Sequence, residues 1–325
     1  MRALLCHQFT GIDGLVMATD ALAPQPGPGE ITVRVRASGM NFLDTLIVSG
    51  KYQVKPPLPF SPGAEIAGEV LSVAPDVTRF KPGDRVCAFT YYGGFAEICS
   101  AKAAFTWHLP DAIDDVVAAA SLITYGTSWF GLADRAQIQP GETCLVLGAA
   151  GGVGLAAIQV AKKFGAHVIA GVGSTARMQI CRDHGADECI DYSGDDFRDR
   201  LKTLLAGRPL NVVVDAVGGA ASQAALRQLS WRGRLLVIGF AAGEIPQFPA
   251  NQILLRGMDV LGVVLDGLFK HEPDRAAQMM TDLFSAIASG ALKPPVTEVL
   301  CLESAPEALV RMAQRQAHGK RVVTP

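Results

Sequence analysis

The amino-acid sequence predicts an α/β protein with two domains: a mostly β domain, followed by a doubly wound domain built on a parallel sheet. Three observations lead to this fold class. The chain has 325 residues, which is more than one hydrophobic core usually organises. The first third is rich in Gly, Pro and short strand-like runs, whereas strand-like and helix-like segments alternate from about residue 120 onward. Hydrophobic residues make up 49% and charged residues 18% of the chain, as in globular proteins.

The first third contains several short strands. The segment 31–37 reads ITVRVRA, and this strict alternation of apolar and polar residues is typical of a half-buried strand. The segments 65–73 and 85–89 are further strand candidates. Lys81-Pro82-Gly83-Asp84 places Pro and Gly where a tight turn uses them. We therefore expect a compact, barrel-like β domain.

The second part of the chain alternates between strands and helices. The segment 143–147 reads TCLVL, a continuous apolar run of the kind found in strands buried on both faces. A helical pattern follows it at 152–164. This alternation is the signature of a parallel, doubly wound sheet. The further elements we expect are strands at 167–172, 188–190, 212–215, 235–239 and 260–264, with helices at 175–184, 195–205 and 220–229.

The C-terminal tail is predicted to return to the first domain. Its pattern indicates helices at 275–289 and 306–313, with strands at 296–301 and 321–323. If these strands pair with the first domain, that domain is discontinuous in sequence. The predicted organisation is therefore a β-rich domain at 1–122, an α/β domain at 123–264, and a return segment at 265–325 that completes the first domain.

Charge, targeting signals and cysteine usage narrow the class of protein. The net charge is −2 and no Lys/Arg-rich run occurs, which disfavours a nucleic-acid partner. The N-terminus lacks the pattern of a secretory signal. From the sequence we expect the apolar stretches to be far shorter than the ~20 residues that cross a bilayer. Seven widely spaced cysteines without a Cys-x-x-Cys pair favour reduced thiols. We expect a cytoplasmic protein without a membrane partner.

A glycine-rich turn lies between the strand at 143–147 and the helix that follows. Residues 147–154 read LGAAGGVG. Glycine permits a tight turn and lets a pyrophosphate approach backbone N–H groups, and the helix N-terminus favours its negative charge. The match to G-x-G-x-x-G is imperfect, because Ala149 takes the first position and only Gly151 and Gly154 are in place. The turn predicts a dinucleotide site; the alternative is a turn that only packs the helix on the sheet.

The end of the second strand of this domain indicates which dinucleotide binds. An NAD site usually has Asp or Glu there, bonded to the ribose 2′-hydroxyl. This chain has Gly173 and Ser174 at that tip and Arg177 three residues later. A 2′-phosphate needs hydrogen-bond donors, positive charge and room. We therefore predict NADPH as the cofactor, although Arg177 alone also fits a solvated helix residue.

Several motifs together resemble one known superfamily. They are the run AAGGVG, the segment PGAEIAGEV at 62–70, and the segment FKPGDRV at 80–86. With the order of the two domains, they resemble the medium-chain dehydrogenase/reductase superfamily, and within it the quinone oxidoreductase or zeta-crystallin branch. The similarity covers essentially the whole chain. It implies a GroES-like β-rich domain, a Rossmann domain and an oxidoreductase activity, with a homodimer formed through edge strands such as 260–264.

The resemblance also implies that no metal site is present. Zinc-dependent members carry a Cys after the early strand and a His in a Gly-His-Glu segment. This sequence has Asn41 and Ala64 at those places, and neither replaces a thiolate or an imidazole on zinc. The lobe of four close cysteines that holds a structural zinc is absent, because 93–97 runs on without it.

The chemistry that remains is hydride transfer to an acceptor with its own electron sink. Without a Lewis acid nothing lowers the pKa of an alcohol, so alcohol oxidation is disfavoured. Quinones, enones and enoyl thioesters accept hydride at carbon and delocalise the charge onto a carbonyl oxygen. We predict an NADPH-dependent reductase of a quinone or another carbonyl-conjugated acceptor. Two alternatives are an enoyl-thioester reductase of the acryloyl-CoA type and a non-catalytic NADPH-binding protein.

The resemblance implies the candidate site residues, position by position. Asn41 would bond the nicotinamide side or the acceptor carbonyl, and Asp44 would orient its neighbours. The phenol of Tyr52 would bond cofactor or acceptor, unless Tyr52 is a core or rim residue. The proline-rich segment 55–59 could form a wall that limits acceptor size. Besides Asn41, Ser174 and Arg177, the expected cofactor contacts are Thr127, Ala150, Gly151, Gly152, Val153, Gly173, Tyr192, Val217, Phe240, Val263, Leu265 and Arg321, the last with a surface role as its alternative.

Overall fold

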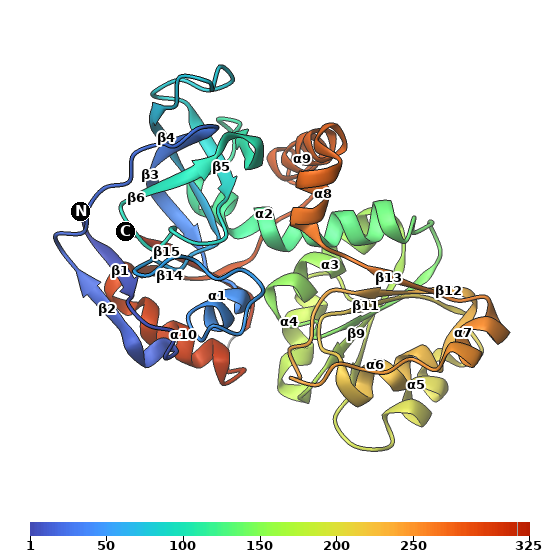
Figure 1. Cartoon of the computed structure of the whole chain (residues 1–325). Helices are drawn as coiled ribbons and strands as arrows, with labels where there is room; N and C mark the ends of the chain where they lie inside the picture. The colour runs from blue at the N-terminus through green and yellow to red at the C-terminus, as the bar shows by residue number, and fades with distance from the viewer. Residues whose placement is uncertain (317) are drawn as a thin grey trace. The chain divides into compact units, whose positions relative to one another are not determined.

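The computed structural model describes residues 1–316 and 318–325, and these divide into two compact units (Figure 1). The first unit comprises Met1–Ile123, Leu268–Gly290 and Pro294–Pro325. The second comprises Thr124–Gly267 and Ala291–Lys293. The boundaries expected from the sequence, after residues 122 and 264, fall within a few residues of these, and the short segment Ala291–Lys293 was expected in the return segment instead.

The first unit is built on a mostly antiparallel sheet. Its core is formed by Ile31, Val33 and Val35 of the long strand β3 with Ile66 and Val86 of its neighbours. The alternating run at 31–37 thus does what its period predicts, placing every second side chain in the core. The strand order is β14 (Val296–Cys301), β15 (Lys320–Thr324), β3 (Glu30–Gly39), β4 (Glu65–Val73), β5 (Arg85–Phe89) and β7 (Thr106–His108), with β6 (Ile98–Lys102) also paired to β3 and a separate pair of β1 (Ala3–Cys6) and β2 (Leu15–Ala18).

The tail pairs back onto the first unit, as the sequence predicts. Strand β15 pairs antiparallel with β3 through Val322 opposite Gly39 and Val323 opposite Ser38. On its other side β15 runs parallel to β14. This return places Lys320, the first residue of β15, near the end of β3. The helices and helical turns of this unit are η1 (Ile12–Gly14), α1 (Phe42–Ile47), η2 (Ala103–Phe105), α9 (Pro273–Ala288), η5 (Leu302–Ser304) and α10 (Ala305–Ala313).

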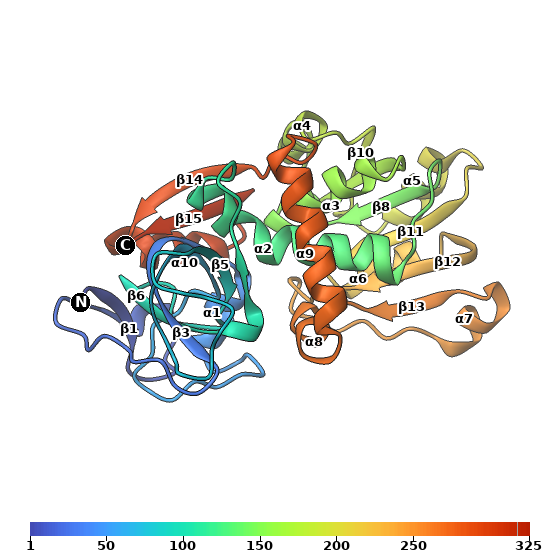
Figure 2. The ribbon, with the colours of Figure 1, turned by 90° about the horizontal axis from the view of Figure 1, so that it is seen from above.

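The second unit is a six-stranded parallel sheet. Its order is β10–β9–β8–β11–β12–β13, with β10 and β13 at opposite edges (Figure 2). Strand β8 is buried at every residue, which explains its uninterrupted apolar sequence. The bounds are β8 (Thr143–Leu147), β9 (His167–Val172), β10 (Glu188–Asp191), β11 (Leu210–Asp215), β12 (Leu229–Val237) and β13 (Asp259–Gly262).

Helices cover both faces of this sheet. Figure 1 shows α3 on one side of the sheet and α5 and α6 on the other. The arrangement is the doubly wound one that the alternation of elements predicts. The helices and helical turns are η3 (Phe130–Arg135), α3 (Gly152–Lys163), η4 (Thr175–Arg177), α4 (Met178–Asp183), α5 (Phe197–Leu205), α6 (Gly219–Leu226), α7 (Ala250–Arg256) and α8 (Leu265–His271), the last running on into the first unit.

One long helix corrects the sequence-based expectation about apolar stretches. Helix α2 (Asp115–Trp129) continues through η3, and this 21-residue segment is long and apolar enough to cross a bilayer. However, 72% of its most apolar window is buried inside the molecule, as expected of a core helix. The segment was missed because it is apolar on all sides and so lacks the 3.6-residue period of a surface helix.

The largest error at an element boundary concerns β12. The expected strand was 235–239 and the expected helix before it was 220–229, but β12 begins at Leu229 and α6 ends at Leu226. Trp231 and Arg232 are exposed within β12. They interrupt the apolar run, so only the buried second half of the strand is recognisable in the sequence.

Candidate functional site

The glycine turn of the second unit connects β8 to α3. Gly148 has φ +70°, and the N–H of Gly151 donates to the Gly148 carbonyl at 3.0 Å. A Cβ on Gly154 would lie 2.3 Å from that same carbonyl oxygen, so no side chain fits there. The first N–H groups of α3, from Gly152 and Val153, have no acceptor within the helix. The turn therefore presents backbone donors and a helix N-terminus at the carboxyl end of β8.

The turn lies where the strand order of the sheet reverses. Strands β8 and β11 are neighbours, and the chain leaves them toward opposite edges of the sheet. Ligands of such sheets bind at this point, outside the carboxyl ends of the strands. Val217, which follows β11, packs beside the turn, because a Cβ on Gly148 would lie 2.9 Å from its Cγ2. Phe240 adjoins the same loop, since a Cβ on Gly218 would lie 3.2 Å from its Cδ1.

Asp215 shapes the loop that carries Val217. It is the last residue of β11 and is fully buried. Its Oδ1 accepts the N–H groups of Val217 and Gly218, each at 2.9 Å. Sequence reasoning missed Asp215, although an Asp at a strand end, three residues before Gly218-Gly219, is a recognisable turn signal.

The residues expected at the adenosine end lie together. A Cβ on Gly173 would lie 3.4 Å from the Tyr192 phenol oxygen, and the Tyr192 N–H donates to the Val172 carbonyl at 2.8 Å. Ser174 accepts, at its carbonyl, the N–H of Arg177 at 3.0 Å. The segment from Gly173 to Arg177 holds no carboxylate. Its donors and charge fit a ribose 2′-phosphate better than a free 2′-hydroxyl.

Helix α2 brings Thr127 to the same region of the second unit. The hydroxyl of Ser128, the next residue, lies 3.2 Å from the Val153 carbonyl, which ties α2 to the first turn of α3. Val263 packs close to Gly131, where a Cβ would lie 3.5 Å from it, and its N–H donates to the Val237 carbonyl at 3.0 Å. Leu265 is buried at the start of α8. The backbone and small residues around the turn therefore fit a dinucleotide.

The first unit contributes a buried polar cluster that begins at Asn41. Asn41 precedes α1, and its backbone N–H donates to Asp44 Oδ2 at 2.7 Å. The other carboxylate oxygen of Asp44 accepts the N–H of Gly63 at 3.1 Å. Asp44 is fully buried. Its carboxyl group thus joins the start of α1 to the segment before β4, and its expected orienting role stays a prediction.

Glu65 and Lys320 complete this cluster around the Asn41 side chain. The Asn41 amide nitrogen donates to Glu65 Oε1 at 2.8 Å and to the Gly39 carbonyl at 3.1 Å. Lys320 Nζ donates to Asn41 Oδ1 at 2.7 Å and forms an ion pair with Glu65 Oε1. The second oxygen of Glu65 accepts the N–H of Ile123 at 2.8 Å. The side chains of Lys320 and Glu65 are only 3% and 0% exposed.

These bonds fix the orientation of the Asn41 amide. Both of its N–H donors are used within the protein. Rotating the amide by half a turn would set its nitrogen against the Lys320 ammonium and its oxygen against the Glu65 carboxylate. Asn41 can donate to a bound molecule only by exchanging one of these bonds, whereas Oδ1 keeps a second lone pair. Its contact with cofactor or acceptor stays a prediction.

Asp44 is the titratable group of this cluster. Burial raises its pKa from 3.8 to about 7. The backbone N–H groups of Asn41 and Gly63 and the charge of Lys320 oppose this rise, while the charge of Glu65 adds to it. Asp44 therefore gains or loses its proton near neutral pH.

Comparisons with known proteins place the chain in a family. Residues 27–111 match the alcohol dehydrogenase GroES-like domain, and residues 152–283 match the zinc-binding dehydrogenase family. The quinone oxidoreductase-like protein 2 homolog of Nematostella vectensis is 37% identical over 99% of this chain and 88% of its own length. The quinone oxidoreductase of Pseudomonas aeruginosa is 36% identical over 93% of each chain. The crystal structure of Escherichia coli quinone oxidoreductase complexed with NADPH superposes with a TM-score of 0.91, at 31% identity, over the full length of both chains.

The chain belongs to the zinc-independent quinone oxidoreductase branch of the medium-chain dehydrogenase/reductase superfamily. It is an oxidoreductase. The resemblance seen in the sequence is confirmed, and so is the fold class of a GroES-like domain with a Rossmann domain.

In this member of the quinone oxidoreductase branch, two neighbours on β15 face opposite ways. Strand geometry sends successive side chains to opposite faces. Lys320 is directed to Asn41, whereas Arg321 is directed to Glu298, whose Oε2 lies 2.7 Å from its Nε. The alternative of a surface role for Arg321 is wrong, because it is only 6% exposed. Its contact with the cofactor stays a prediction, and sequence reasoning overlooked Lys320 beside it.

Tyr52 packs against an apolar cluster of the first unit. It packs on the apolar residues Ile47 and Val48 at the far end of α1, together with Cys6 and Phe60. Half-buried packing of this kind agrees with a rim tyrosine and still leaves Tyr52 partly exposed. Its role as a hydrogen-bond donor to cofactor or acceptor stays a prediction.

The cysteines of this quinone oxidoreductase-branch protein are free thiols. Burial raises the pKa of Cys144 to about 12, which keeps that thiol protonated, and burial likewise raises the pKa of Cys87 well above its usual value. Over residues 1–316 and 318–325, no group of three or more His, Cys, Asp or Glu side chains is placed to hold a metal ion.

Proposed function

We propose that the protein is an NADPH-dependent reductase that transfers hydride, without zinc, to a quinone or another carbonyl-conjugated acceptor. The observation that supports it most is the Asn41 cluster. By the resemblance, Asn41 stands where metal-dependent relatives have a zinc-ligating Cys. In this protein the Lys320 ammonium lies 2.7 Å from the Asn41 side-chain oxygen. A fixed ammonium disfavours a divalent cation beside it. Ala64, at the expected His position, offers no ligand.

The choice of NADPH rests on the tip of β9. Gly173, Ser174 and Arg177 provide room, a hydroxyl and a guanidinium, and the segment holds no carboxylate that would repel a 2′-phosphate. Escherichia coli quinone oxidoreductase, which superposes over the whole chain, is described as complexed with NADPH. NADPH would bind with its pyrophosphate at the amides of Ala150 to Val153. Bound there, it supplies the hydride.

In this proposal the chain binds the cofactor, orients the reactants and excludes water from them. Helix α3 and the glycine turn bind the pyrophosphate. Val217, Phe240 and Val263, in the same unit, supply the apolar contacts expected with the cofactor. Asn41, held by Lys320 and Glu65, presents one oxygen in a fixed position. The acceptor places the developing negative charge on its own carbonyl oxygen, so it needs a hydrogen-bond donor rather than a metal. Tyr52 or water provides that donor.

The test is the rate of NADPH oxidation with a panel of acceptors: benzoquinone, phenanthrenequinone, an enone and acryloyl-CoA. Each reaction is repeated with NADH and with a metal chelator. We expect NADPH turnover that resists the chelator, with a quinone or an enone giving the highest kcat/KM. Best turnover with acryloyl-CoA would make the protein an enoyl-thioester reductase. Loss of activity on chelation, restored by zinc, would overturn the metal-free proposal.

We further propose that the protein is a cytoplasmic homodimer joined through β13. This strand is an edge of the six-stranded sheet and pairs only with β12 among the described residues. An open edge is a template for a second strand. Antiparallel pairing of two β13 strands would extend the sheet across both copies. Sedimentation velocity tests this, and a protein that stays monomeric at micromolar concentration would contradict it.

A further inference from the structure

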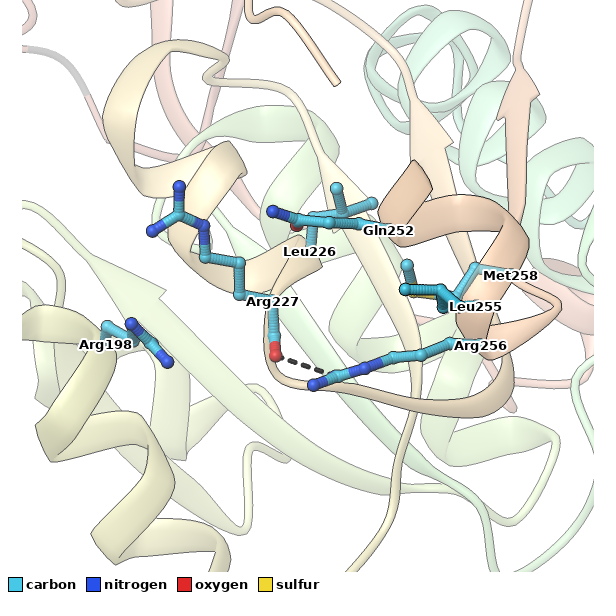
Figure 3. A pocket seen from close by; sticks show the side chains of 7 residues that line it. All are labelled: Arg198, Leu226, Arg227, Gln252, Leu255, Arg256 and Met258. Carbon is cyan, nitrogen blue, oxygen red and sulfur yellow. Dashed lines mark hydrogen bonds between the residues drawn. The ribbon is translucent and has the colours of Figure 1, made fainter. Parts of the chain in front are cut away.

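A pocket of about 470 Å³ opens on the second unit, and none of the residues expected at the dinucleotide site lines it. Figure 3 shows the side chains that do. It is formed by α5, by the end of α6, by α7 and by the segments that lead into β12 and β13. Its lining consists of Arg198, Leu226, Arg227, Gln252, Leu255, Arg256 and Met258.

The pocket lies at the opposite edge of the sheet from the glycine turn. Leu226 ends α6, Arg227 lies in the short connection from α6 to β12, and Met258 directly precedes β13, so the pocket adjoins the amino ends of these strands. The glycine turn follows the carboxyl end of β8. Because all six strands are parallel, these two sites are separated by the length of the strands. A ligand in this pocket is therefore distinct from the dinucleotide.

The pocket carries positive charge without a counter-charge. Three arginines line it, and no Asp or Glu does. Neither Arg198 nor Arg227 forms an ion pair with a carboxylate of the described residues, whereas Arg200, two positions after Arg198, pairs with Asp196. Asp196 and Asp199 line a different hollow together with Arg200. Asp196 and Asp199, at the start of α5, thus do not line the arginine pocket, which keeps its charge.

Arg256 is held in place inside the pocket. Its Nη1 donates to the carbonyl oxygens of Arg227 and Leu229, each at 2.8 Å. These bonds use the two N–H groups of Nη1 and leave the Nε and Nη2 donors, which form no further hydrogen bond with the described residues. Figure 3 shows Arg198 and Arg256 reaching toward the pocket from opposite sides. A guanidinium fixed in this way loses little side-chain entropy when it binds an anion.

The floor and rim of the pocket add apolar surface and one amide. Leu255 at the rim is 75% exposed and supplies the accessible apolar surface, whereas Leu226 and Met258 beneath it belong to the core and are only 1% and 4% exposed. Gln252 contributes an amide that can both donate and accept. An inorganic anion alone would leave this apolar surface unused. The lining suits a molecule with an anionic end and a flat, partly apolar end.

We propose that the Arg198–Arg227–Arg256 pocket is a second binding site, for a phosphate-bearing molecule of about mononucleotide size. Arginine forks match phosphate oxygens with paired hydrogen bonds, and the volume lies within the usual range for small-molecule sites. The phosphates bind the guanidinium groups, and the base covers Leu255. The ligand has two sources: a free nucleotide, or the adenosine-phosphate end of a second dinucleotide molecule.

The experiment measures binding with the dinucleotide site filled. ADP, pyrophosphate and excess NADPH are each titrated by calorimetry into protein holding one equivalent of NADPH, and NADPH fluorescence reports displacement at the glycine turn. We expect ADP to bind once per chain without displacing NADPH. Arg227→Gln and Arg198→Gln each weaken that binding about tenfold or more. Arg182→Gln, an exposed arginine of α4 outside the pocket, leaves it unchanged.

The three titrations distinguish a free nucleotide from the end of a second dinucleotide molecule, and they also show which results overturn the proposal. A second equivalent of NADPH that competes with ADP and depends on Arg227 assigns the site to a dinucleotide end, and the lack of such competition assigns it to free nucleotides. Three results overturn the proposal: no ADP binding, binding that Arg198→Gln and Arg227→Gln leave intact, or binding that displaces NADPH. None of these results bears on acceptor turnover, so failure here is distinguishable from failure of the proposed reductase activity.

Discussion

Lys320 Nζ lies 2.7 Å from the side-chain oxygen of Asn41, although 279 positions separate the two residues in the chain. The same ammonium forms an ion pair with Glu65. The C-terminal strand therefore carries the charge that orients a candidate site residue near the start of the first unit. A buried pair of this kind stabilises only when its remaining hydrogen bonds are satisfied. Glu65 meets that condition through its bonds to Asn41 and Ile123.

Lys320→Met should lower the free energy of unfolding by about 3 kcal/mol or more, because it leaves the Glu65 carboxylate buried without its cation. The double substitution Lys320→Met with Glu65→Gln should recover much of that loss, since the charge is then absent as well. Urea unfolding of the two single variants and the double variant gives the coupling free energy directly. Additive effects would show that the pair is not coupled.

The double variant also tests whether the pair positions Asn41 for the reaction. It should fold, yet with the Asn41 amide no longer fixed we expect kcat to fall more than KM rises. Lys320→Arg, which keeps the charge, should retain more activity than Lys320→Met. As a matched control, Arg85→Met removes the 2.6 Å ion pair with Asp115 in the same unit and should cost stability without changing the ratio of kcat to KM. If Arg85→Met changed kcat and KM in the same way as the double variant, the role of Lys320 would be structural only.

Asp44 should make the protein less stable as the pH rises. Its pKa is about 7 in the folded protein against 3.8 in the unfolded chain, so between these values the folded state binds the extra proton. The stabilisation is therefore complete below about pH 4 and is lost as the pH rises through 7. Between about pH 5 and about pH 8 the loss from this one group is about 3 kcal/mol.

Asp44→Asn isolates this contribution. The variant keeps the shape of the side chain but cannot ionise, so its free energy of unfolding should lack the decline that the unchanged protein shows over the same pH range. Chemical denaturation of both proteins at several pH values measures the difference. Parallel curves for the two proteins would mean that the carboxyl group of Asp44 does not titrate in this range.

The glycine turn predicts different outcomes for two neighbouring glycines. Gly154→Ala places a Cβ 2.3 Å from the Gly148 carbonyl, so the turn must move, and we expect a loss of stability of about 1–3 kcal/mol. Gly151→Ala meets the same carbonyl only at 3.3 Å and should fold nearly normally. If the pyrophosphate approaches Gly151, the added methyl group of Gly151→Ala should nevertheless obstruct it, and this variant should bind NADPH more weakly. Unchanged NADPH affinity in Gly151→Ala would contradict that approach.

Periodicity in the sequence predicts the strands well and the cluster at Asn41 poorly. The bounds of β4, β5, β8, β9 and β14 agree with the expected segments, because each is a short run whose alternation or continuous apolar character reflects its burial. Lys320 and Glu65 carry no such signal. Each looks like an ordinary charged residue of a strand, and only the pairing of β15 with β3 brings them together.

The same limitation explains the choice of Arg321 over Lys320. Both residues begin the last strand, and alternation dictates that they face opposite sides. Which of the two faces Asn41 depends on the register between β15 and β3, where Val322 lies opposite Gly39. A single sequence contains no information on a register between segments so far apart. The glycine turn, by contrast, is local, and its strand–turn–helix context is visible in the sequence.

Cofactor preference provides a test of the β9 tip. Ser174→Asp places a carboxylate where NAD-binding Rossmann domains carry one, so it should repel the 2′-phosphate of NADPH and bond the 2′-hydroxyl of NADH. We expect the ratio of kcat/KM for NADPH over NADH to fall by about tenfold or more, which corresponds to about 1.4 kcal/mol. Arg182→Gln makes the same change in net charge on α4 and should leave the ratio unchanged. A ratio that responds equally to both substitutions would indicate a general charge effect, and an unchanged ratio in Ser174→Asp would mean that the 2′-phosphate is bound elsewhere.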